Sequence, residues 1–418
     1  MRRRVVEFKF PLIVIRSERM LRPLERLGRT RVMGPLSVLS LIAMPVLAGT
    51  ATYFLLISLM AILTRPEVQQ AQREAGPASF LLLPGINPYL PVIYGWLGIF
   101  VALMVHEGAH GIIAMRYGYT VKSTGLILFL GIPIGAFVET EDSEMRQGRL
   151  REVLKILSAG PTSNAVVAIA SLVAMVAIAS SVTVSLPLEI ESVMEGGPAS
   201  AAGLRPNDQI NSVNGVPVNS VLQLSNAFAS IGIGGKVELG VIRDGNFLTV
   251  SLTLADIGGG RPGIGVLIRE ADFHILAAEV LERYRRITTS NPLAFFAPPT
   301  FNVVVYPFSE VEACFVTGDS VERCRTISSL FTHPVLGGSY AAVSNALYWM
   351  WFVNINVAIF NALPIYPLDG GQAVRKTLST LLRSGDRSGI VITITTAVSL
   401  FFLSMLLSII LLPYVLVG

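Results

Sequence analysis

Residues 90–117 read LPVIYGWLGIFVALMVHEGAHGIIAMRY, and no Asp, Glu, Lys or Arg occurs in this stretch before Glu107. An apolar run of about 20 residues is long enough for one helix to cross the hydrocarbon of a bilayer. His106 and His110 stand four positions apart, so both imidazoles project from the same face of the expected helix. Because ionisable groups in a membrane helix are costly and face a functional interior, the stretch predicts a membrane helix that presents two histidines inward.

The same apolar character recurs along the chain. Of 418 residues, 52% are hydrophobic and 14% are charged, whereas an average soluble protein has about 25% charged residues. Ordinary cytosolic, collagen-like and disordered proteins are therefore excluded. Stretches without Asp, Glu, Lys or Arg predict five membrane helices, near residues 35–63, 90–117, 153–185, 341–365 and 390–417.

Basic residues predict which side of the membrane each helix end faces. Residues 1–32 hold ten of the 32 lysine and arginine side chains, and the short loops 116–155 and 370–388 hold six and four more. Short basic loops stay in the cytoplasm, so we expect a cytoplasmic N-terminus and an extracytoplasmic segment 186–339. Such a distribution favours anionic lipid, and not nucleic acid, as the partner of the basic residues.

The fold expected is a polytopic α-helical membrane protein, with about five to six transmembrane helices and an inserted extracytoplasmic small β-rich domain. Its segments are a basic cytoplasmic segment (1–32), the first three helices (33–185), the β-rich domain (186–268), an extracytoplasmic or interfacial connector (269–339) and the last two helices (340–418). Residues 123–138 are apolar but interrupted by glycine and proline, which predicts a re-entrant loop or a hairpin.

Two histidines with an adjacent glutamate predict a metal site. The spacing H-E-x-x-H places His106 and His110 where both can bind one Zn²⁺, with Glu107 beside them as a base for the attacking water. A catalytic zinc takes three protein ligands. Asp369 is the candidate third ligand, because it lies near the inner end of the fourth helix, at the same expected depth as the histidines.

The segment 361–371, which reads NALPIYPLDGG, supports Asp369. Pro364 and Pro367 have no backbone N–H to donate, and we expect them to unwind the helix just before the aspartate. The remaining histidines, His274 and His333, are expected outside the membrane, as ordinary surface histidines. Asp369 could alternatively be a helix cap at the inner surface.

These paired motifs resemble those of the site-2 protease family of intramembrane zinc metalloproteases, and the likeness covers roughly residues 79–375. The resemblance implies that His106, His110 and Asp369 bind one zinc ion per chain and that Glu107 is the general base. It also implies that Asn361 contacts the substrate or the developing oxyanion, and that the substrate is a membrane protein already shortened by another protease.

A third element, GPTSN at residues 160–164, is similar to the G-P-x-x-N element of the same family. A simpler role is open for the asparagines of the predicted helices, which could only form hydrogen bonds between helices. These asparagines are Asn164, Asn354, Asn356 and Asn361.

Residues 186–268 differ from the helices, because charges return and short β-rich runs alternate with turn dipeptides. The segment resembles a circularly permuted PDZ domain, with Gly263, Ile264, Gly265 and Val266 as its carboxylate-binding loop and edge strand. PDZ domains bind a peptide C-terminus by strand addition, so this partner is expected here. The alternative is a domain that binds no peptide and acts only as a steric gate for substrates.

Cys314 and Cys324 are the only cysteines of the chain, and both fall in the predicted connector. A disulfide is one expectation in an extracytoplasmic compartment, and two free thiols are the other.

The function predicted is that of an intramembrane zinc endopeptidase in a prokaryotic cell membrane. It would cut peptide bonds within or near transmembrane segments, as in regulated intramembrane proteolysis. A non-catalytic receptor or scaffold with structural zinc is an alternative, but it needs a fourth protein ligand that the sequence does not offer at this depth. A transporter is a third possibility, although no inverted repeat is evident.

Overall fold

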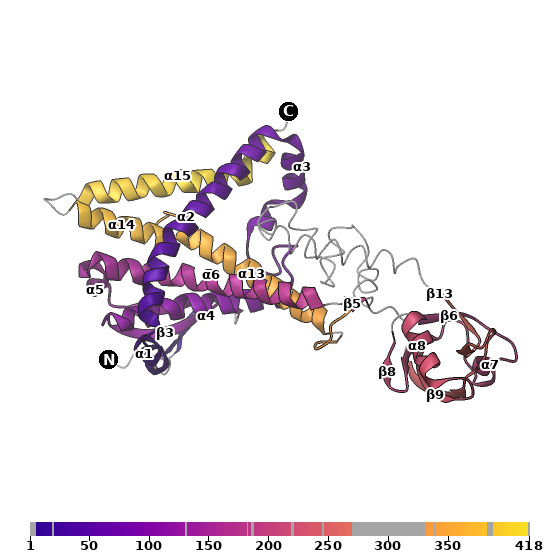
Figure 1. Ribbon diagram of the computed structural model, residues 1–418. Helices are drawn as coiled ribbons and strands as arrows, with labels where there is room; N and C mark the ends of the chain where they lie inside the picture. The colour runs from indigo at the N-terminus through magenta and orange to yellow at the C-terminus, as the bar shows by residue number, and fades with distance from the viewer. Residues whose placement is uncertain are drawn as a thin grey trace. The chain divides into compact units, whose positions relative to one another are not determined.

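The computed structural model describes most of the chain, in two units formed by residues 1–174 with 346–418 and by residues 175–345. Figure 1 traces the chain from its N-terminus to its C-terminus. His274, Cys314, Cys324 and most of the predicted connector lie outside the described residues. The described residues are 6–18, 21–129, 132–181, 183–184, 188–218, 221–244, 246–269, 331–337, 339–382 and 388–416.

Five helices of the described chain are long and apolar enough to span a bilayer (Figure 1). Their ends lie within a few residues of those predicted, as expected where charged residues and prolines end an apolar run. The prediction of a polytopic helical membrane protein is thus confirmed. The helices are α2 (Met33–Thr64), α4 (Val92–Arg116), α6 (Leu150–Ser181), α13 (Tyr340–Ala362) and α15 (Ser388–Val415).

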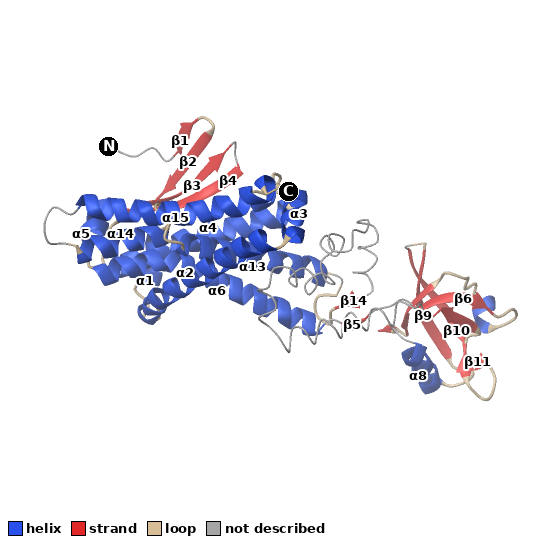
Figure 2. Cartoon of the chain, turned by 90° about the horizontal axis from the view of Figure 1, so that it is seen from above, coloured by secondary structure: helices blue, strands red, loops and turns tan. Residues whose placement is uncertain are grey.

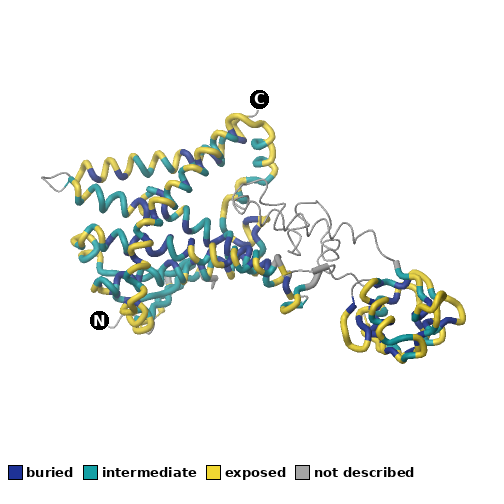
Figure 3. The backbone as a smooth tube through the Cα atoms, in the orientation of Figure 1, coloured by how far each residue is buried: buried dark blue, intermediate teal, exposed yellow. Residues whose placement is uncertain are grey.

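The spanning helices differ in how far they are buried (Figure 3). In the apolar 18-residue stretch of α13, 44% of the residues are buried, whereas 17% are buried in the corresponding stretches of α2 and α15. Apolar side chains on the exposed faces of α2 and α15 suit contact with lipid. The interior of the helical unit therefore lies around α13, α4 and α6.

Small residues allow α4 to approach α13 closely. Gly98, Ala102 and His106 are all buried on α4. A Cβ added at Gly98 would lie 3.0 Å from both the Trp349 carbonyl oxygen and Val353 of α13. Close backbone approach through small residues is a common way to pack helices in lipid, and here it brings the histidine-bearing part of α4 into the interior.

A four-stranded antiparallel sheet lies beside these helices, in the order β1–β2–β3–β4 (Figure 2). Of residues 123–138, for which a re-entrant loop or a hairpin was open, the described parts 123–129 and 132–138 lie in two paired antiparallel strands, as in a hairpin. Two further strands of the sheet lie within the predicted basic segment 1–32, where the sequence analysis predicted no strand. The strands are β1 (Val6–Lys9), β2 (Leu12–Ser17), β3 (Val121–Phe129) and β4 (Ile132–Thr140).

Shorter helices join these elements. Through α3 (Pro66–Ala75), Gln72 Nε2 donates to the Ile409 carbonyl of α15 at 3.1 Å and Arg73 Nη1 to the Pro413 carbonyl at 2.9 Å. The other short helices are α1 (Leu21–Gly28), η1 (Pro77–Phe80), α5 (Asp142–Gln147) and α14 (Asp369–Leu381).

The inserted β-rich domain, called here the PDZ-like domain, comprises residues 188–269. Its sheet follows the order β10–β9–β7–β6–β13, with β8 paired to β7, and α8 (Val221–Ile231) contributes Leu224 and Phe228 to its core. The strands are β6 (Leu188–Val193), β7 (Gln209–Val213), β8 (Val216–Pro217), β9 (Lys236–Arg243), β10 (Asn246–Thr253), β11 (Ala255–Asp256), β12 (Pro262–Gly263) and β13 (Val266–Arg269). The short helix α7 covers Pro198–Ala201, and outside the domain β5 (Thr183–Val184) pairs with β14 (Phe331–Thr332).

Candidate metal centre

The three side chains predicted as metal ligands lie together in the helical unit. His106 and His110 come from α4, and Asp369 is the first residue of α14. Asp369 Oδ2 lies 3.0 Å from His106 Nε2 and 3.3 Å from His110 Nε2. One potential ligand atom from each residue lies within 4.8 Å of the others, which is compact enough for all three to hold a single ion.

The donor set fits a zinc ion. His106 and Asp369 are each 7% exposed, and Asp369 Oδ2 is a buried oxygen without a hydrogen-bond partner, although two imidazole nitrogens face it. A buried carboxylate oxygen without a hydrogen bond is costly unless an ion contacts it. Two imidazoles and one carboxylate form a ligand set that catalytic zinc uses in proteins.

The chain between α13 and α14 positions Asp369. Helix α13 ends at Ala362, and the non-helical residues that follow include Pro364 and Pro367. A Cβ added at Gly370 would clash with the carbonyl oxygens of Ala362 and Leu363. Glycine after the aspartate therefore lets α14 begin against the end of α13. A negative side chain in the first turn is also favoured by the helix dipole.

Glu107 is held by the neighbouring sheet. Its Oε2 accepts a hydrogen bond from the backbone N–H of Val138 in β4, at 3.0 Å. The same strand packs against α4 at Gly111, where an added Cβ would lie 3.2 Å from the Val138 side chain. Strand β4 thus orients the carboxylate that follows His106 in the sequence.

Helix α6 packs against the two imidazoles. The His110 ring nitrogen Nδ1 is 2.7 Å from the Ile156 carbonyl oxygen, and the Asn164 amide is 3.1 Å from His106 Nδ1. A Cβ added at Gly160 would meet both imidazoles. Sequence analysis did not assign Ile156 or Gly160 to the site, although the GPTSN element marked this part of the chain.

The asparagines of α13 bond within their own helix. Asn361 Nδ2 donates to the Val357 carbonyl at 3.0 Å, and no described contact joins it to the three candidate ligands. Asn354 and Asn356 likewise donate to carbonyls four residues earlier in α13. Of the four asparagines considered, Asn164 is the one whose described hydrogen bond crosses to another helix.

His333 takes part in a local turn. Its Nδ1 accepts hydrogen bonds from the backbone N–H groups of Val335 and Leu336, each at 3.1 Å. Among the described residues the metal-binding group contains His106, His110 and Asp369 and does not include His333.

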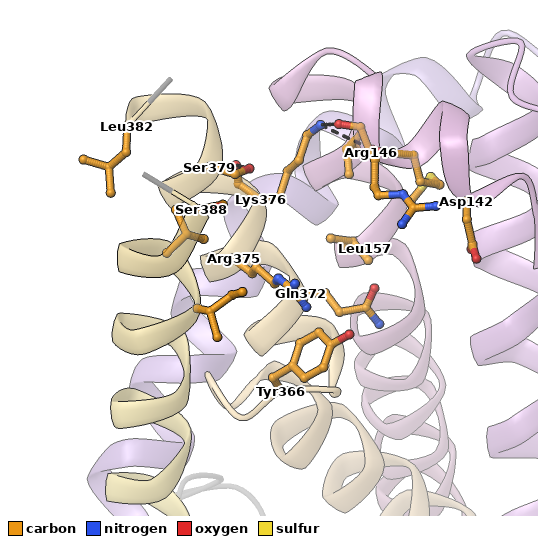
Figure 4. A pocket seen from close by; sticks show the side chains of 14 residues that line it. Asp142, Arg146, Leu157, Tyr366, Gln372, Arg375, Lys376, Ser379, Leu382 and Ser388 are labelled. Atoms are coloured by element: carbon orange, nitrogen blue, oxygen red, sulfur yellow. Dashed lines mark hydrogen bonds between the residues drawn. The ribbon is translucent and has the colours of Figure 1, made fainter. Parts of the chain in front are cut away.

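A cavity of about 670 Å³ opens between α5, α6, α14 and the start of α15 (Figure 4). Leu157 of α6 and Gln372 of α14 line it, and Gln372 lies one helical turn after Asp369. On its wall, Lys376 Nζ donates to the Arg146 carbonyl at 2.6 Å, and the Arg375 guanidinium lies 4.9 Å from the centre of the Tyr366 ring. Its lining therefore includes both charged and apolar groups.

Membrane-spanning helices that enclose a buried His–His–Asp group are the features of an integral membrane metalloprotease. The model of peptidase family M50, the site-2 protease family, matches residues 94–406, about three quarters of the chain. The chain belongs to this family. The matched range contains both histidines and Asp369.

Known proteins are similar to the chain over most of its length or over the PDZ-like domain. An uncharacterized protein of Methanocaldococcus jannaschii is 25% identical over 357 residues, which cover 85% of this chain and 75% of that one. A Clostridium perfringens protein provisionally named a zinc metalloprotease is 21% identical over 317 residues, 70% of this chain and 89% of that one. Among solved structures, the PDZ domain of an SdrC-like protein from Listeria monocytogenes is 22% identical, with a TM-score of 0.20, covering 21% of this chain and 90% of that one.

Proposed function

We propose that the chain is an intramembrane zinc endopeptidase, in which His106, His110 and Asp369 hold one zinc ion per chain. The observation that carries the proposal is the buried Asp369 Oδ2, which faces both imidazole Nε2 atoms at 3.0 and 3.3 Å without a hydrogen-bond partner. Family membership supports a protease. Among the described residues the group has three ligands, as in catalytic zinc sites, whereas a structural site takes four.

A zinc ion bound here supplies Lewis-acid chemistry, because it polarises a peptide carbonyl and lowers the pKa of water. Glu107 is the proposed general base, which takes a proton from the attacking water and returns it to the leaving amine. The hydrogen bond from the Val138 N–H to Oε2 fixes the orientation of this carboxylate. A fixed base within reach of the attacking water is the arrangement that proton transfer requires.

Asn361 is the proposed contact to the developing oxyanion. Its amide must then exchange the hydrogen bond to the Val357 carbonyl for one to the substrate. Loss of an oxyanion donor lowers kcat by about 10²–10³-fold. We expect Asn361→Ala to lower kcat by this factor while KM and zinc content stay the same. A kcat within about threefold of the wild-type value would remove Asn361 from the proposed machinery.

The substrates proposed are membrane proteins already shortened by another protease. A helix hides its carbonyl groups in internal hydrogen bonds, so the spanning segment of a substrate must unwind locally before attack. Leu157, the neighbour of Ile156, and Gln372, one turn after Asp369, line the cavity of Figure 4, which supports this cavity as a route for water toward the metal centre. We place the N-terminus in the cytoplasm of a prokaryotic cell because the short loops 116–155 and 370–388 are basic.

The PDZ-like domain is the proposed binding site for the free C-terminus of such a substrate. Strand β13 is an edge strand of the sheet, because its one described partner is β6. The preceding loop is fixed by hydrogen bonds from the Met194 N–H to the Gly265 carbonyl and from the Ala199 N–H to the Ile264 carbonyl, each at 2.9 Å. An edge strand after a glycine loop suits strand addition and carboxylate capture.

The direct test is cleavage of a single-span model substrate by the purified full chain in liposomes. Glu107→Gln keeps an oxygen that can accept from the Val138 N–H but removes the base. We expect the variant to retain zinc and to lose about 10²–10⁴-fold in kcat. Unaltered cleavage would exclude Glu107 as the base, and a wild-type chain that retains zinc without cleaving would favour a receptor or scaffold.

A further inference from the structure

One face of α6 contacts both histidines of the metal centre. Ile156, Gly160 and Asn164 are spaced four residues apart, so they lie along the same face of the helix. Ile156 offers its carbonyl oxygen to His110 Nδ1 at 2.7 Å, and Asn164 lies 3.1 Å from His106 Nδ1. Between them, α6 has no side chain at Gly160.

Gly160 allows this close approach. A Cβ at this position would lie 2.7 Å from His106 Nε2 and would also collide with His110 Nε2. Both Nε2 atoms belong to the edge of the ring that faces Asp369. Any larger residue at position 160 must therefore displace the atoms that would bind the ion.

An imidazole that binds a metal through Nε2 must carry its proton on Nδ1, where it needs a hydrogen-bond acceptor. For His110 the acceptor is the Ile156 carbonyl oxygen, which can accept but not donate. For His106 the group in reach is the Asn164 side chain. This side chain is 0% exposed, and its Oδ1 has no hydrogen-bond partner.

A half-turn of the Asn164 amide exchanges its nitrogen and oxygen and leaves its shape almost unchanged. Oδ1 then takes the position 3.1 Å from His106 Nδ1, where it can accept the ring proton. The exchange gives Oδ1 a hydrogen-bond partner and moves Nδ2 to the position that Oδ1 now occupies. It also fixes the tautomer of His106 that has its lone pair on Nε2.

We propose that Asn164 is a positioning residue for the metal centre, whose Oδ1 accepts from His106 Nδ1–H and so directs His106 Nε2 toward the ion. The inference rests on the proposed function, because it requires zinc at His106. It goes beyond that function by assigning to α6 the orientation of both imidazoles: His110 through a backbone carbonyl and His106 through an amide oxygen.

The alternative role of Asn164 is to join α6 to α4 without affecting the ion. Ser163 provides a matched control, because its Oγ donates to the Val105 carbonyl of α4 at 3.0 Å and is not in described contact with either imidazole. Ser163→Ala removes a hydrogen bond between the same two helices. Asn164→Leu removes the acceptor at similar volume, and Asn164→Asp keeps an acceptor.

The test is the zinc affinity of the full chain in detergent, measured by competition with a chromophoric chelator. Loss of an acceptor behind a metal-binding histidine typically weakens metal binding by about 10–100-fold. We expect this loss for Asn164→Leu, an affinity within about threefold of wild type for Asn164→Asp, and no change for Ser163→Ala.

Thermal unfolding with and without zinc gives a second readout in case Asn164→Leu does not fold. Asn164→Asp should lower the Tm of the zinc-free chain, because its carboxylate is buried without an ion nearby, but should keep at least the wild-type rise in Tm on adding zinc. A smaller rise than in the wild type overturns the proposal.

The outcomes separate this inference from the proposed function. A wild-type chain that binds no zinc overturns both. Zinc binding by the wild type together with equal affinity in Asn164→Leu overturns only the role of Asn164. If Asn164→Leu, Asn164→Asp and Ser163→Ala all lose zinc affinity equally, Asn164 acts in helix packing, and the proposal is overturned as well.

Discussion

Two buried aspartates, one in each unit, have opposite surroundings. Asp208 in the PDZ-like domain is 1% exposed, and Asp369 in the helical unit is 7% exposed. Arg243 donates to both carboxylate oxygens of Asp208 at 2.7 Å, and the Arg205 N–H donates to Oδ2 at 2.8 Å. Asp369 Oδ2 has two imidazoles beside it but no hydrogen bond.

The difference separates a structural carboxylate from a candidate ligand. A buried carboxylate that is fully hydrogen-bonded has its charge compensated within the protein, and it contributes to the stability of the fold. One whose oxygen faces two imidazole nitrogens without hydrogen bonds has lone pairs available to an ion. Removing each aspartate should therefore have different consequences.

The largest effect is expected for Asp369→Asn. Loss of a proposed ligand should lower cleavage by roughly 10³-fold or more and weaken zinc binding. The thermal stability of the zinc-free chain should change little, because the asparagine side chain has the same shape and can still contact the two imidazole nitrogens that face Asp369 Oδ2. Cleavage assays and thermal unfolding without zinc check both parts. A large drop in Tm without zinc would mean that Asp369 is structural, like Asp208.

Asp208→Ala should act on stability instead. Breaking a buried ion pair typically lowers the free energy of unfolding by about 3–5 kcal/mol. Because Arg243 is partly exposed, we expect a loss of about 3 kcal/mol or less for Asp208→Ala. Hydrogen exchange of core amides such as Leu239 in the full chain measures it. Asp244→Asn at the exposed neighbouring turn is the control. If the exchange protection of Leu239 were unchanged in Asp208→Ala, Asp208 would not have the structural role assigned to it.

Acid should produce a smaller effect in the same domain. The hydrogen bond from Arg243 is the main favourable contact that holds the pKa of Asp208 below its usual value, against the opposing effect of burial. A carboxyl group with a lowered folded-state pKa stabilises the fold above its unfolded pKa of about 3.9, and that stabilisation is lost as the pH falls through the folded-state pKa. Exchange protection at Leu239 should therefore decrease below about pH 4 in the wild type and less steeply in Asp208→Asn. Parallel curves for the two proteins would contradict this assignment.

Local sequence signals predicted the spans and the proposed ligands. Runs without charged residues define the five helices, and the four-residue spacing of His106 and His110 already places both imidazoles on one face. Asp369 followed from its expected depth and from Pro364 and Pro367, which lie in the break between α13 and α14.

Other features depend on contacts between distant segments. Strand β2 pairs with β3 through Leu12 and Phe129, a register that no local pattern specifies. Ile156 contributes a backbone carbonyl, which any residue has, and Gly160 contributes the absence of a side chain. Neither group has a side chain whose chemistry marks it in the sequence. The GPTSN element marked this part of α6, but its contacts with the two imidazoles became visible only in three dimensions.

X-ray absorption at the zinc edge of the purified full chain tests the central claim most directly. We predict one zinc per chain with nitrogen and oxygen neighbours at about 2.0–2.2 Å, the multiple-scattering signature of two imidazoles, and loss of most of the bound zinc in Asp369→Ala at a limiting zinc concentration. The account is contradicted if the chain binds no zinc, if sulfur neighbours appear near 2.3 Å, or if Asp369→Ala retains as much zinc as the wild type at that concentration.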